Sequence, residues 1–155
     1  MKIYLGTDHA GFELKEKLKV FLKAEGHQVA DEGAFELDPA DDYPEFVKIV
    51  AQQVACDPEN NRGIILGASG QGEAICANRY ASIRAAVYYG GPGEIVTLSR
   101  EHNNANILSL GAKFLTPEKA IAAVKLWLGT NFSNEERHLR RLNQIDYRPP
   151  AQNNF

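Results

Sequence analysis

The stretch from residue 63 to residue 77, GIILGASGQGEAICA, constrains the fold of this chain more than any other. It begins with Ile64-Ile65-Leu66, a short apolar run typical of a buried parallel strand, and then carries glycines at positions 67, 70 and 72. Glycines let the backbone turn sharply and bring its N–H groups close to a ligand, and the residues from Glu73 onward have the pattern of a helix. The stretch therefore predicts a strand, an anion-binding loop and a helix.

Glu73 lies on the first turn of that expected helix. The helix dipole there favours the charged, and therefore basic, form of a carboxylate. A base beside an anion-binding loop that contains Ser69 suits removal of a proton next to a carbonyl group. The alternative is a tight structural connection with a favourable dipole contact. Nucleotide binding is disfavoured, because the loop lacks the Gly-Lys-Ser/Thr of a P-loop and the third glycine of a dinucleotide fingerprint.

Apolar segments alternate with amphipathic segments along the chain. Strands are expected at residues 2–6, 28–31, 64–66, 83–89 and 107–110, with helices between them and a capping box at Ser133 to Glu136 that begins a final helix. This alternation predicts an α/β fold, a Rossmann-like three-layer α/β/α sandwich around a five-stranded parallel sheet. Of the 155 residues, 1–148 are expected to form a single domain and 149–155 a loosely ordered tail.

The composition disfavours several classes of partner. A formal net charge of -3 gives no reason to expect nucleic-acid binding. The chain has no long apolar run and no signal pattern after Met1, so no membrane contact and a cytoplasmic location are expected. Cys56 and Cys76 lack metal or redox spacing, and no H-E-x-x-H pattern occurs, so no metal is expected.

Ligands of a parallel sheet bind outside the carboxyl ends of its strands. The polar side chains that follow strands, and are therefore expected at that edge, are Asp8, His9, Ser69 and Glu73, with Asp42 and Tyr43 as further candidates. A histidine near a turn is more often a surface or hydrogen-bonding residue than a functional one. The anion-binding loop at the same edge favours a functional role for His9.

Two other polar clusters lie later in the chain. The segment from Arg100 to Asn106 places His102 among amides just before the fifth strand. Arg137 and Arg141 are four residues apart and so share one face of the last helix, a spacing suited to gripping a phosphate from two sides. A solvated basic face that balances neighbouring glutamates is the alternative for an isolated helix. The anion-binding loop elsewhere in the chain favours the phosphate clamp.

These motifs together resemble the type B ribose-5-phosphate isomerases, a family that also contains the galactose-6-phosphate isomerase subunits. The resemblance covers about residues 2–146, in order and at compatible spacing. Members of this family interconvert aldose and ketose phosphates through an enediol, without a cofactor. The segments that carry it are Asp8-His9-Ala10-Gly11, Asp42-Tyr43-Pro44, GASGQGE at 67–73, Ala77-Asn78, the Arg100–Asn106 cluster and Arg137-His138-x-x-Arg141.

The resemblance implies roles for the candidate residues. Glu73 is the implied base, as in the glutamate branch of the family, whereas another branch uses a cysteine at the position of Gly67. Ser69 and the amides around Gly70 and Gly72 are implied to hold the enediolate, and His102 to help open the sugar ring. The substrate-binding residues expected are Asp8, His9, Tyr43, Gly70, Gly72, Asn103, Lys113, Arg137 and Arg141, with lysine at 113 where related sequences often have an arginine.

The function expected is interconversion of ribose 5-phosphate and ribulose 5-phosphate, a step of the pentose phosphate pathway. Isomerisation of another aldose phosphate, of the galactose-6-phosphate or allose-6-phosphate type, stays open. A non-catalytic phosphosugar-binding domain also stays open. Glu73 argues against the latter, because a pure anion binder gains nothing from a carboxylate beside its phosphate.

His102 and Asn103 precede the fifth strand and are therefore expected at the opposite edge of the sheet from Glu73. A five-residue strand spans roughly 16 Å, which one hydrogen bond cannot bridge. A homodimer in which two chains share each active site is therefore expected, with a tetramer left open. The alternative is that the loop from Glu101 to Ala105 folds back over the glycine loop of its own chain.

Overall fold

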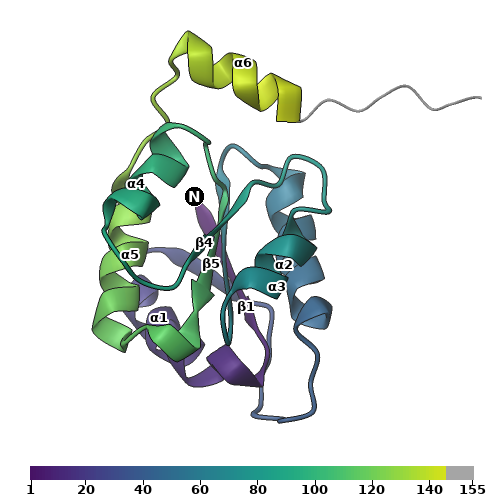
Figure 1. Cartoon of the computed structure of the whole chain (residues 1–155). Helices are drawn as coiled ribbons and strands as arrows, with labels where there is room; N and C mark the ends of the chain where they lie inside the picture. The colour runs from purple at the N-terminus through teal and green to yellow at the C-terminus, as the bar shows by residue number, and fades with distance from the viewer. Residues whose placement is uncertain (146–155) are drawn as a thin grey trace, which may run out of the picture.

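Short apolar runs of this chain pair into one parallel sheet in the computed structural model, which describes residues 1–145 (Figure 1). The strand order is β2-β1-β3-β5-β4, and every pairing is parallel. The strands are β1 (Lys2–Thr7), β2 (Gln28–Asp31), β3 (Asn61–Gly67), β4 (Ala85–Tyr88) and β5 (Ile107–Gly111). The expected five-stranded parallel sheet is confirmed. The tail expected at 149–155 and the end of the expected domain lie outside the described residues.

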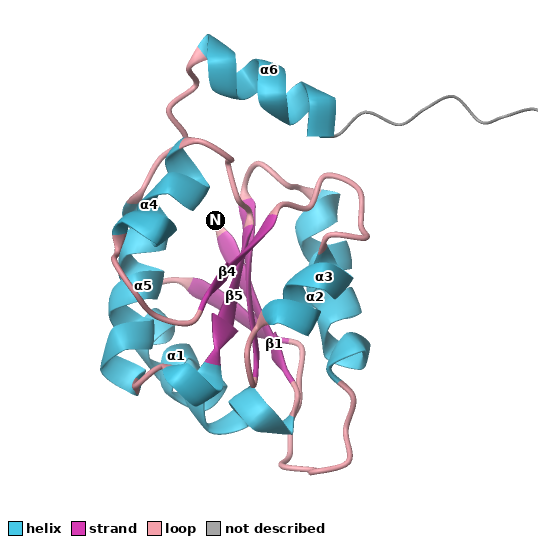
Figure 2. Ribbon diagram, in the orientation of Figure 1, coloured by secondary structure: helices cyan, strands magenta, loops and turns pink. Residues whose placement is uncertain are grey.

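Helices cover both faces of the sheet (Figure 2). One face carries α1 (Phe12–Ala24), α4 (Glu94–Glu101) and α5 (Pro117–Gly129), and the other carries α2 (Tyr43–Cys56) and α3 (Gln71–Ala77). Two short 3-10 turns, η1 (His9–Gly11) and η2 (Ala112–Phe114), follow β1 and β5. The three-layer, Rossmann-like sandwich is therefore confirmed. None of the helices within residues 1–145 has the length and apolar character that a bilayer crossing requires.

Alternation along the central strands divides the core between the two faces. Leu5 and Leu66 are fully buried against α1 and α5, where Trp127 is also fully buried. Ile65 points to the other face and packs with Val50 of α2. Each fully buried aliphatic side chain of this size stabilises the fold by about 1.5–3 kcal/mol, so the sheet is a rigid platform for the loops at its two ends.

The boundaries differ from the sequence expectation by more than one residue at two strands. β3 begins at Asn61, before the apolar run, because Asn61 and Arg62 pair in register with Lys2 and Ile3 of β1. β4 begins at Ala85, two residues later than expected. Ordinary ladder pairing is absent just before it, because the backbone N–H of Arg84 donates to the side-chain amide oxygen of Asn106 at 2.9 Å.

The last helix, α6 (Glu136–Ile145), starts without the capping box expected at Ser133 to Glu136. In a capping box, the Ser133 backbone N–H would donate a hydrogen bond to the Glu136 side chain. Here it donates to the carbonyl of Glu101 at 3.1 Å. The Ser133 hydroxyl accepts from the N–H of Glu135 at 3.4 Å, one residue short of the expected partner. The capping-box expectation is therefore wrong, although the helix itself is present.

The two ends of the sheet differ in what covers them. We call the end where the strands finish the carboxyl edge; η1, η2 and the start of α3 lie there. We call the other end the amino edge; α6 lies across it, beyond the C-terminus of α4 (Figure 1). Parallel strands place all the residues that follow them at the carboxyl edge and all the residues that precede them at the amino edge.

Candidate active site

The glycine loop, residues 67–72, joins β3 to α3 at the carboxyl edge. Gly70 adopts a left-handed conformation, with φ of 77°, at the N-cap of α3. Its carbonyl accepts a hydrogen bond of 2.6 Å from the buried Ser109 hydroxyl of β5, and the N–H of Gln71 donates to the Ser69 hydroxyl at 3.3 Å. A β-carbon at Gly70 would lie 3.0 Å from the carbonyl carbon of Leu110. The loop is therefore held against β5 in one conformation that favours glycine.

Glu73 turns its carboxyl back toward the start of this loop. The side chain is only 5% exposed, and a β-carbon placed on Gly67 would overlap the carboxyl group, with Oε2 at 2.8 Å. The Glu73 carboxyl therefore occupies the space that a side chain at position 67 would need. A cysteine base at 67 and a glutamate base at 73, the two alternatives implied by the family resemblance, exclude each other sterically at this site.

Burial raises the pKa of Glu73, and the nearby charge of Asp8 raises it further. The expectation that the helix dipole would favour the charged form is therefore wrong in direction. The reason is physical: α3 has only seven residues, and loss of hydration around a 5% exposed carboxyl outweighs a short helix's dipole. A raised pKa brings a carboxylate closer to the pH at which it can both accept and return a proton.

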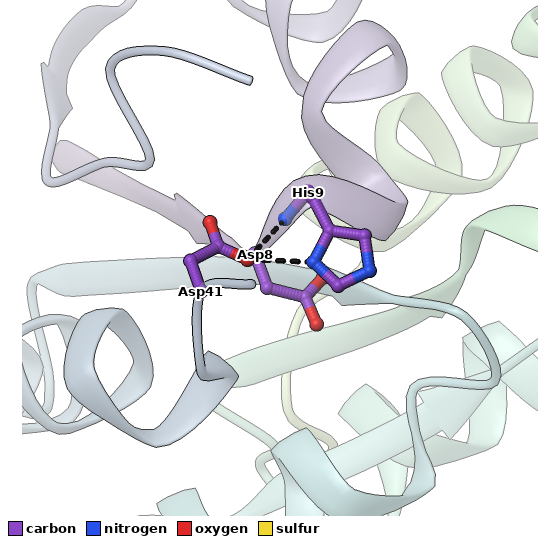
Figure 3. Close-up of side chains that lie close together, drawn as sticks. All are labelled: Asp8, His9 and Asp41. Carbon is purple, nitrogen blue, oxygen red and sulfur yellow. Dashed lines mark hydrogen bonds and ion pairs between the residues drawn. The ribbon is translucent and has the colours of Figure 1, made fainter. Parts of the chain in front are cut away.

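Asp8, His9 and Asp41 lie close together at the carboxyl edge, and two hydrogen bonds join His9 to Asp41 (Figure 3). Asp8 is 7% exposed and caps η1, accepting from the N–H of Ala10 at 3.0 Å, and burial raises its pKa. Asp41 Oδ1 accepts from the backbone N–H of His9 at 2.9 Å and lies 2.6 Å from His9 Nδ1. This double contact fixes the imidazole and leaves Nε2 without a partner among the described residues.

Sequence reasoning missed Asp41 and named its neighbour Asp42 instead. Asp42 is exposed at the N-cap of α2 and makes no side-chain capping bond. The available signal was the acidic pair just before Tyr43, and only the loop path shows which of the two turns inward.

Ligand atoms of Asp8, His9 and Asp41 lie within 4.8 Å of one another, the one set within residues 1–145 that a metal ion could use. Asp41 Oδ1 already accepts two contacts from His9, which fits positioning of the imidazole.

The hydrogen bond from Asp41 raises the pKa of His9 above its ordinary value of 6.5. We expect Asp41→Asn to lower this pKa toward 6.5, whereas Asp38→Asn, which removes a more distant charge, should change it much less. Because the folded-state pKa is raised, the pair stabilises the fold fully below pH 6.5 and loses that effect as pH rises through the His9 pKa. NMR titration of the His9 ring protons measures both variants, and an unchanged pKa in Asp41→Asn would contradict the assignment.

Two more expected residues reach the glycine loop. Tyr43, on the first turn of α2, places its hydroxyl 2.7 Å from where a β-carbon on Gly72 would lie. Lys113 in η2 donates its backbone N–H to the carbonyl of Ala68 at 3.1 Å, and its side chain is exposed. The carboxyl edge thus brings together these expected residues: Asp8, His9, Tyr43, Ser69, Gly70, Gly72, Glu73 and Lys113.

The remaining expected residues lie at the amino edge. His102 is the C-cap of α4, and its ring lies 4.2 Å from the ring of the buried His138 of α6. Arg137 and Arg141 are exposed on α6, and Arg137 Nε lies 2.8 Å from a carboxylate oxygen of Glu135. The arginine face is thus partly balanced by a glutamate, as the alternative interpretation anticipated. Asn103 is exposed beside His102.

The loop after α4 stays at this edge. The N–H of Asn104 donates to the carbonyl of Arg100 at 3.0 Å, and the N–H of Ala105 donates to that of Ser99 at 2.9 Å. Both bonds fold the loop against the end of its own helix. The alternative that residues 101–105 fold back over the glycine loop is therefore wrong. The length of β5, five residues or roughly 16 Å, lies between His102 and the carboxyl edge of the same chain.

A buried carboxylate against a glycine loop, at the carboxyl edge of a Rossmann-like sheet, defines a class of α/β protein equipped for proton transfer next to a bound anion. Comparison with known proteins defines the family. A model of the Ribose/Galactose Isomerase family matches residues 3–145. The chain belongs to this family.

Individual relatives match nearly the whole chain. Ribose-5-phosphate isomerase B of Mycolicibacterium paratuberculosis is 43% identical over 142 residues, which cover 92% of this chain and 87% of the relative. The Escherichia coli protein of that name is 36% identical, with 93% of each chain covered.

Solved structures of proteins with the same name superpose closely on this chain. Ribose-5-phosphate isomerase B of Mycoplasma genitalium, with bound ribulose-5-phosphate, superposes with a TM-score of 0.90 at 33% identity and coverage of 94% and 93% of the two chains. The Thermotoga maritima enzyme superposes with a TM-score of 0.85 at 41% identity, covering 94% and 97%. The similarity therefore extends through both edges of the sheet and is not confined to the glycine loop.

Proposed function

We propose that this protein is an aldose-ketose isomerase that interconverts ribose 5-phosphate and ribulose 5-phosphate through an enediol intermediate. The observation that carries the proposal is the buried Glu73 carboxyl, packed against Gly67 beside the glycine loop. Family membership supports it, as does the bound ribulose-5-phosphate in the Mycoplasma genitalium relative. A cytoplasmic location, expected from the sequence, stays a prediction.

In the proposed reaction, Glu73 removes the proton from C2 of the open-chain aldose and returns it to C1 of the enediolate, so one carboxyl group serves as base and then as acid. The negative charge that develops on the substrate oxygen is stabilised by the Ser69 hydroxyl and by N–H groups of residues 70–72. His9, whose ring is fixed by Asp41, presents Nε2 to the bound substrate. Asp8 and Tyr43 contact the hydroxyl groups of its sugar. The step exchanges protons only and needs no external oxidant or reductant.

His102 is assigned to ring opening, and Arg137 and Arg141 to the phosphate. These residues lie at the amino edge, so the proposal requires a second copy of the chain to bring its amino edge to the carboxyl edge of the first. A C2 homodimer supplies two such sites. Large apolar side chains that are exposed in the single chain, among them Ile75 at 61%, Tyr89 at 49% and Phe114 at 58%, give the second copy a surface to cover. A tetramer stays an open alternative.

Arg137→Ala and Arg141→Ala are each expected to weaken binding of ribose 5-phosphate by about 1.5–3 kcal/mol, the scale of a charge-assisted hydrogen bond to phosphate. Arg140→Ala, which removes another exposed arginine of the same helix that is not assigned to the phosphate, is the matched control. Unphosphorylated ribose should respond to none of the three changes. Steady-state kinetics measures KM and kcat for both sugars, and equal losses for ribose and ribose 5-phosphate would favour a structural role.

The proposed activity is tested by incubating the purified protein, with chelator and without cofactor, with ribose 5-phosphate, galactose 6-phosphate and allose 6-phosphate separately. Ketose formation is expected from ribose 5-phosphate with the highest kcat/KM. A higher kcat/KM for either six-carbon sugar would reassign the substrate. Saturable binding of all three without any ketose would instead identify a non-catalytic phosphosugar-binding domain.

A further inference from the structure

We propose that a pocket at the amino edge, behind α6, is a second binding site, one that takes a small organic phosphate. The pocket has a volume of about 580 Å³, within the range of roughly 300–1,000 Å³ that small-molecule sites occupy. Its floor carries Arg62 of β3, Arg84 just before β4, and Arg100 of α4, and its outer wall includes Leu139 of α6. None of the residues assigned above to the sugar phosphate lines it. Leu139 and the Arg137–Arg141 pair lie on opposite flanks of α6.

Three guanidinium groups from three separate elements meet in this pocket. Burial, together with the charges of Arg62 and Arg84, lowers the pKa of Arg100 to about 10, and burial with the charge of Arg84 lowers that of Arg62. Arg62 and Arg100 both stay charged near neutral pH. Among the described residues that line the pocket, the one carboxylate is that of Glu59, an exposed side chain. The like charges of Arg62 and Arg100 in this partly desolvated site oppose folding, and a bound anion would offset their repulsion.

Arg100 is held so that part of its guanidinium stays open. Arg100 donates Nε to the carbonyl of Thr130 at 3.2 Å and Nη1 to Asn104 Oδ1 at 2.9 Å and the carbonyl of Ala105 at 2.6 Å. Its guanidinium also lies 5.8 Å from the ring centre of Trp127. Within residues 1–145, Arg100 Nη2 has no hydrogen-bond acceptor. A buried arginine with three fixed donor contacts is preorganised, so little rotamer freedom is lost when a ligand binds.

Arg62 is anchored in the same way through one nitrogen. Its Nη1 donates to the carbonyls of Glu59 and Asn61 at 3.0 and 2.8 Å, while Nε and Nη2 have no acceptor within the described chain. The buried polar atoms without partners in that part of the chain are Asp41 Oδ2 and Trp127 Nε1, so the open nitrogens of Arg62 and Arg100 are not sealed off from solvent. Both residues line the pocket, where an incoming anion can reach these nitrogens.

The chemistry of the lining selects the ligand class. Guanidinium groups match the oxygens of phosphate in a two-pronged geometry, and the open nitrogens of Arg62 and Arg100 suit a ligand with two negative charges. The pocket is far larger than a single water, whose share of liquid volume is about 30 Å³, so it has room for an organic group beside the phosphate. Asn131 and Asn143 offer amides to hydroxyl groups, and Phe132 offers an apolar surface. These features fit a phosphorylated, hydroxyl-bearing metabolite.

Inorganic pyrophosphate is the minimal probe for this site, titrated into the uniformly ¹⁵N-labelled full chain. Saturable amide shifts are expected at Asn104, Ala105 and Asn131, resolved from any shifts at residues 69–72 of the proposed active site. Arg62→Gln should raise the Kd measured at these amides by about tenfold or more, because it removes a charged donor. Arg140→Gln, which removes an exposed arginine outside the pocket, should leave that Kd unchanged.

Loss of the fold is excluded by comparing the remaining amide resonances of Arg62→Gln with those of the parent chain. Should Arg62→Gln not fold, Asn131→Asp places a carboxylate on the exposed rim of the pocket and is expected to weaken pyrophosphate binding by repulsion. Absence of shifts at Asn104, Ala105 and Asn131 in millimolar pyrophosphate would overturn the proposal. The same Kd in the parent chain and in the folded pocket variant would also overturn it. Neither result bears on ribose 5-phosphate isomerisation.

Discussion

Glu73→Gln is expected to lower kcat for ribose 5-phosphate by about a hundredfold or more while leaving the fold nearly unchanged. The amide has nearly the size and shape of the carboxyl, so it still fills the space against Gly67. It cannot accept the proton from C2. Phosphate binding should be retained, because Arg137, Arg141 and the glycine loop are untouched. Glu45→Gln, which changes an exposed glutamate on the first turn of α2, is the matched control and should keep the parent kcat.

The pH dependence gives a second measure of the same residue. Because burial raises the pKa of Glu73 above its ordinary value of 4.5, kcat/KM should rise with pH through that raised pKa and then level off. Glu73→Gln should remove this acid limb from whatever activity remains. Undiminished proton exchange at the substrate carbon in the variant would rule out Glu73 as the base.

Mixing two inactive variants is expected to restore about a quarter of the parent activity. His102→Ala removes a residue of the amino edge, and Glu73→Ala removes one of the carboxyl edge. If each site combines both edges from two chains, random reassociation places half the chains in mixed dimers, and each mixed dimer contains one intact site out of two. The expectation follows from the roughly 16 Å of β5 that separates the two edges within one chain.

The control for this experiment uses two variants of the same edge. Ser69→Ala mixed with Glu73→Ala should recover no activity, since both sites of the mixed dimer then contain a damaged glycine loop. Mixed dimers can be followed by native mass spectrometry. Mixed dimers that demonstrably form between His102→Ala and Glu73→Ala, yet show no activity, would contradict a shared site.

The sheet and its edges were predictable because their signals are local. An apolar run such as Ile64-Ile65-Leu66 followed by clustered glycines defines a strand end wherever it occurs, and parallel pairing then places every strand end together. The division of the candidate residues between the two edges followed from whether each one precedes or follows its strand. The structure agrees for His102 and Glu73.

What escaped prediction depends on contacts between segments distant in sequence. Asp41 meets His9 across 32 residues of chain, and no spacing rule distinguishes it from Asp42. The pKa of Glu73 depends on burial beneath neighbouring elements, which a helix-dipole argument alone leaves out. Arg62, Arg84 and Arg100 come from three elements that only the folded sheet brings to one pocket. Such convergence is set by tertiary packing, so a single sequence carries no pattern for it.

The most direct test of the central claim is to incubate the protein with ribose 5-phosphate in heavy water, without cofactor, and to follow C1 and C2 by NMR. Proton transfer through Glu73 and an enediol predicts ribulose 5-phosphate with deuterium at C1 and gradual deuteration of the remaining ribose 5-phosphate at C2, both strongly reduced in Glu73→Gln. Ribulose 5-phosphate that forms at an undiminished rate in Glu73→Gln, or without any deuterium in the parent protein, would contradict the proposed mechanism. Absence of ribulose 5-phosphate from the active, folded parent chain would contradict the proposed function itself.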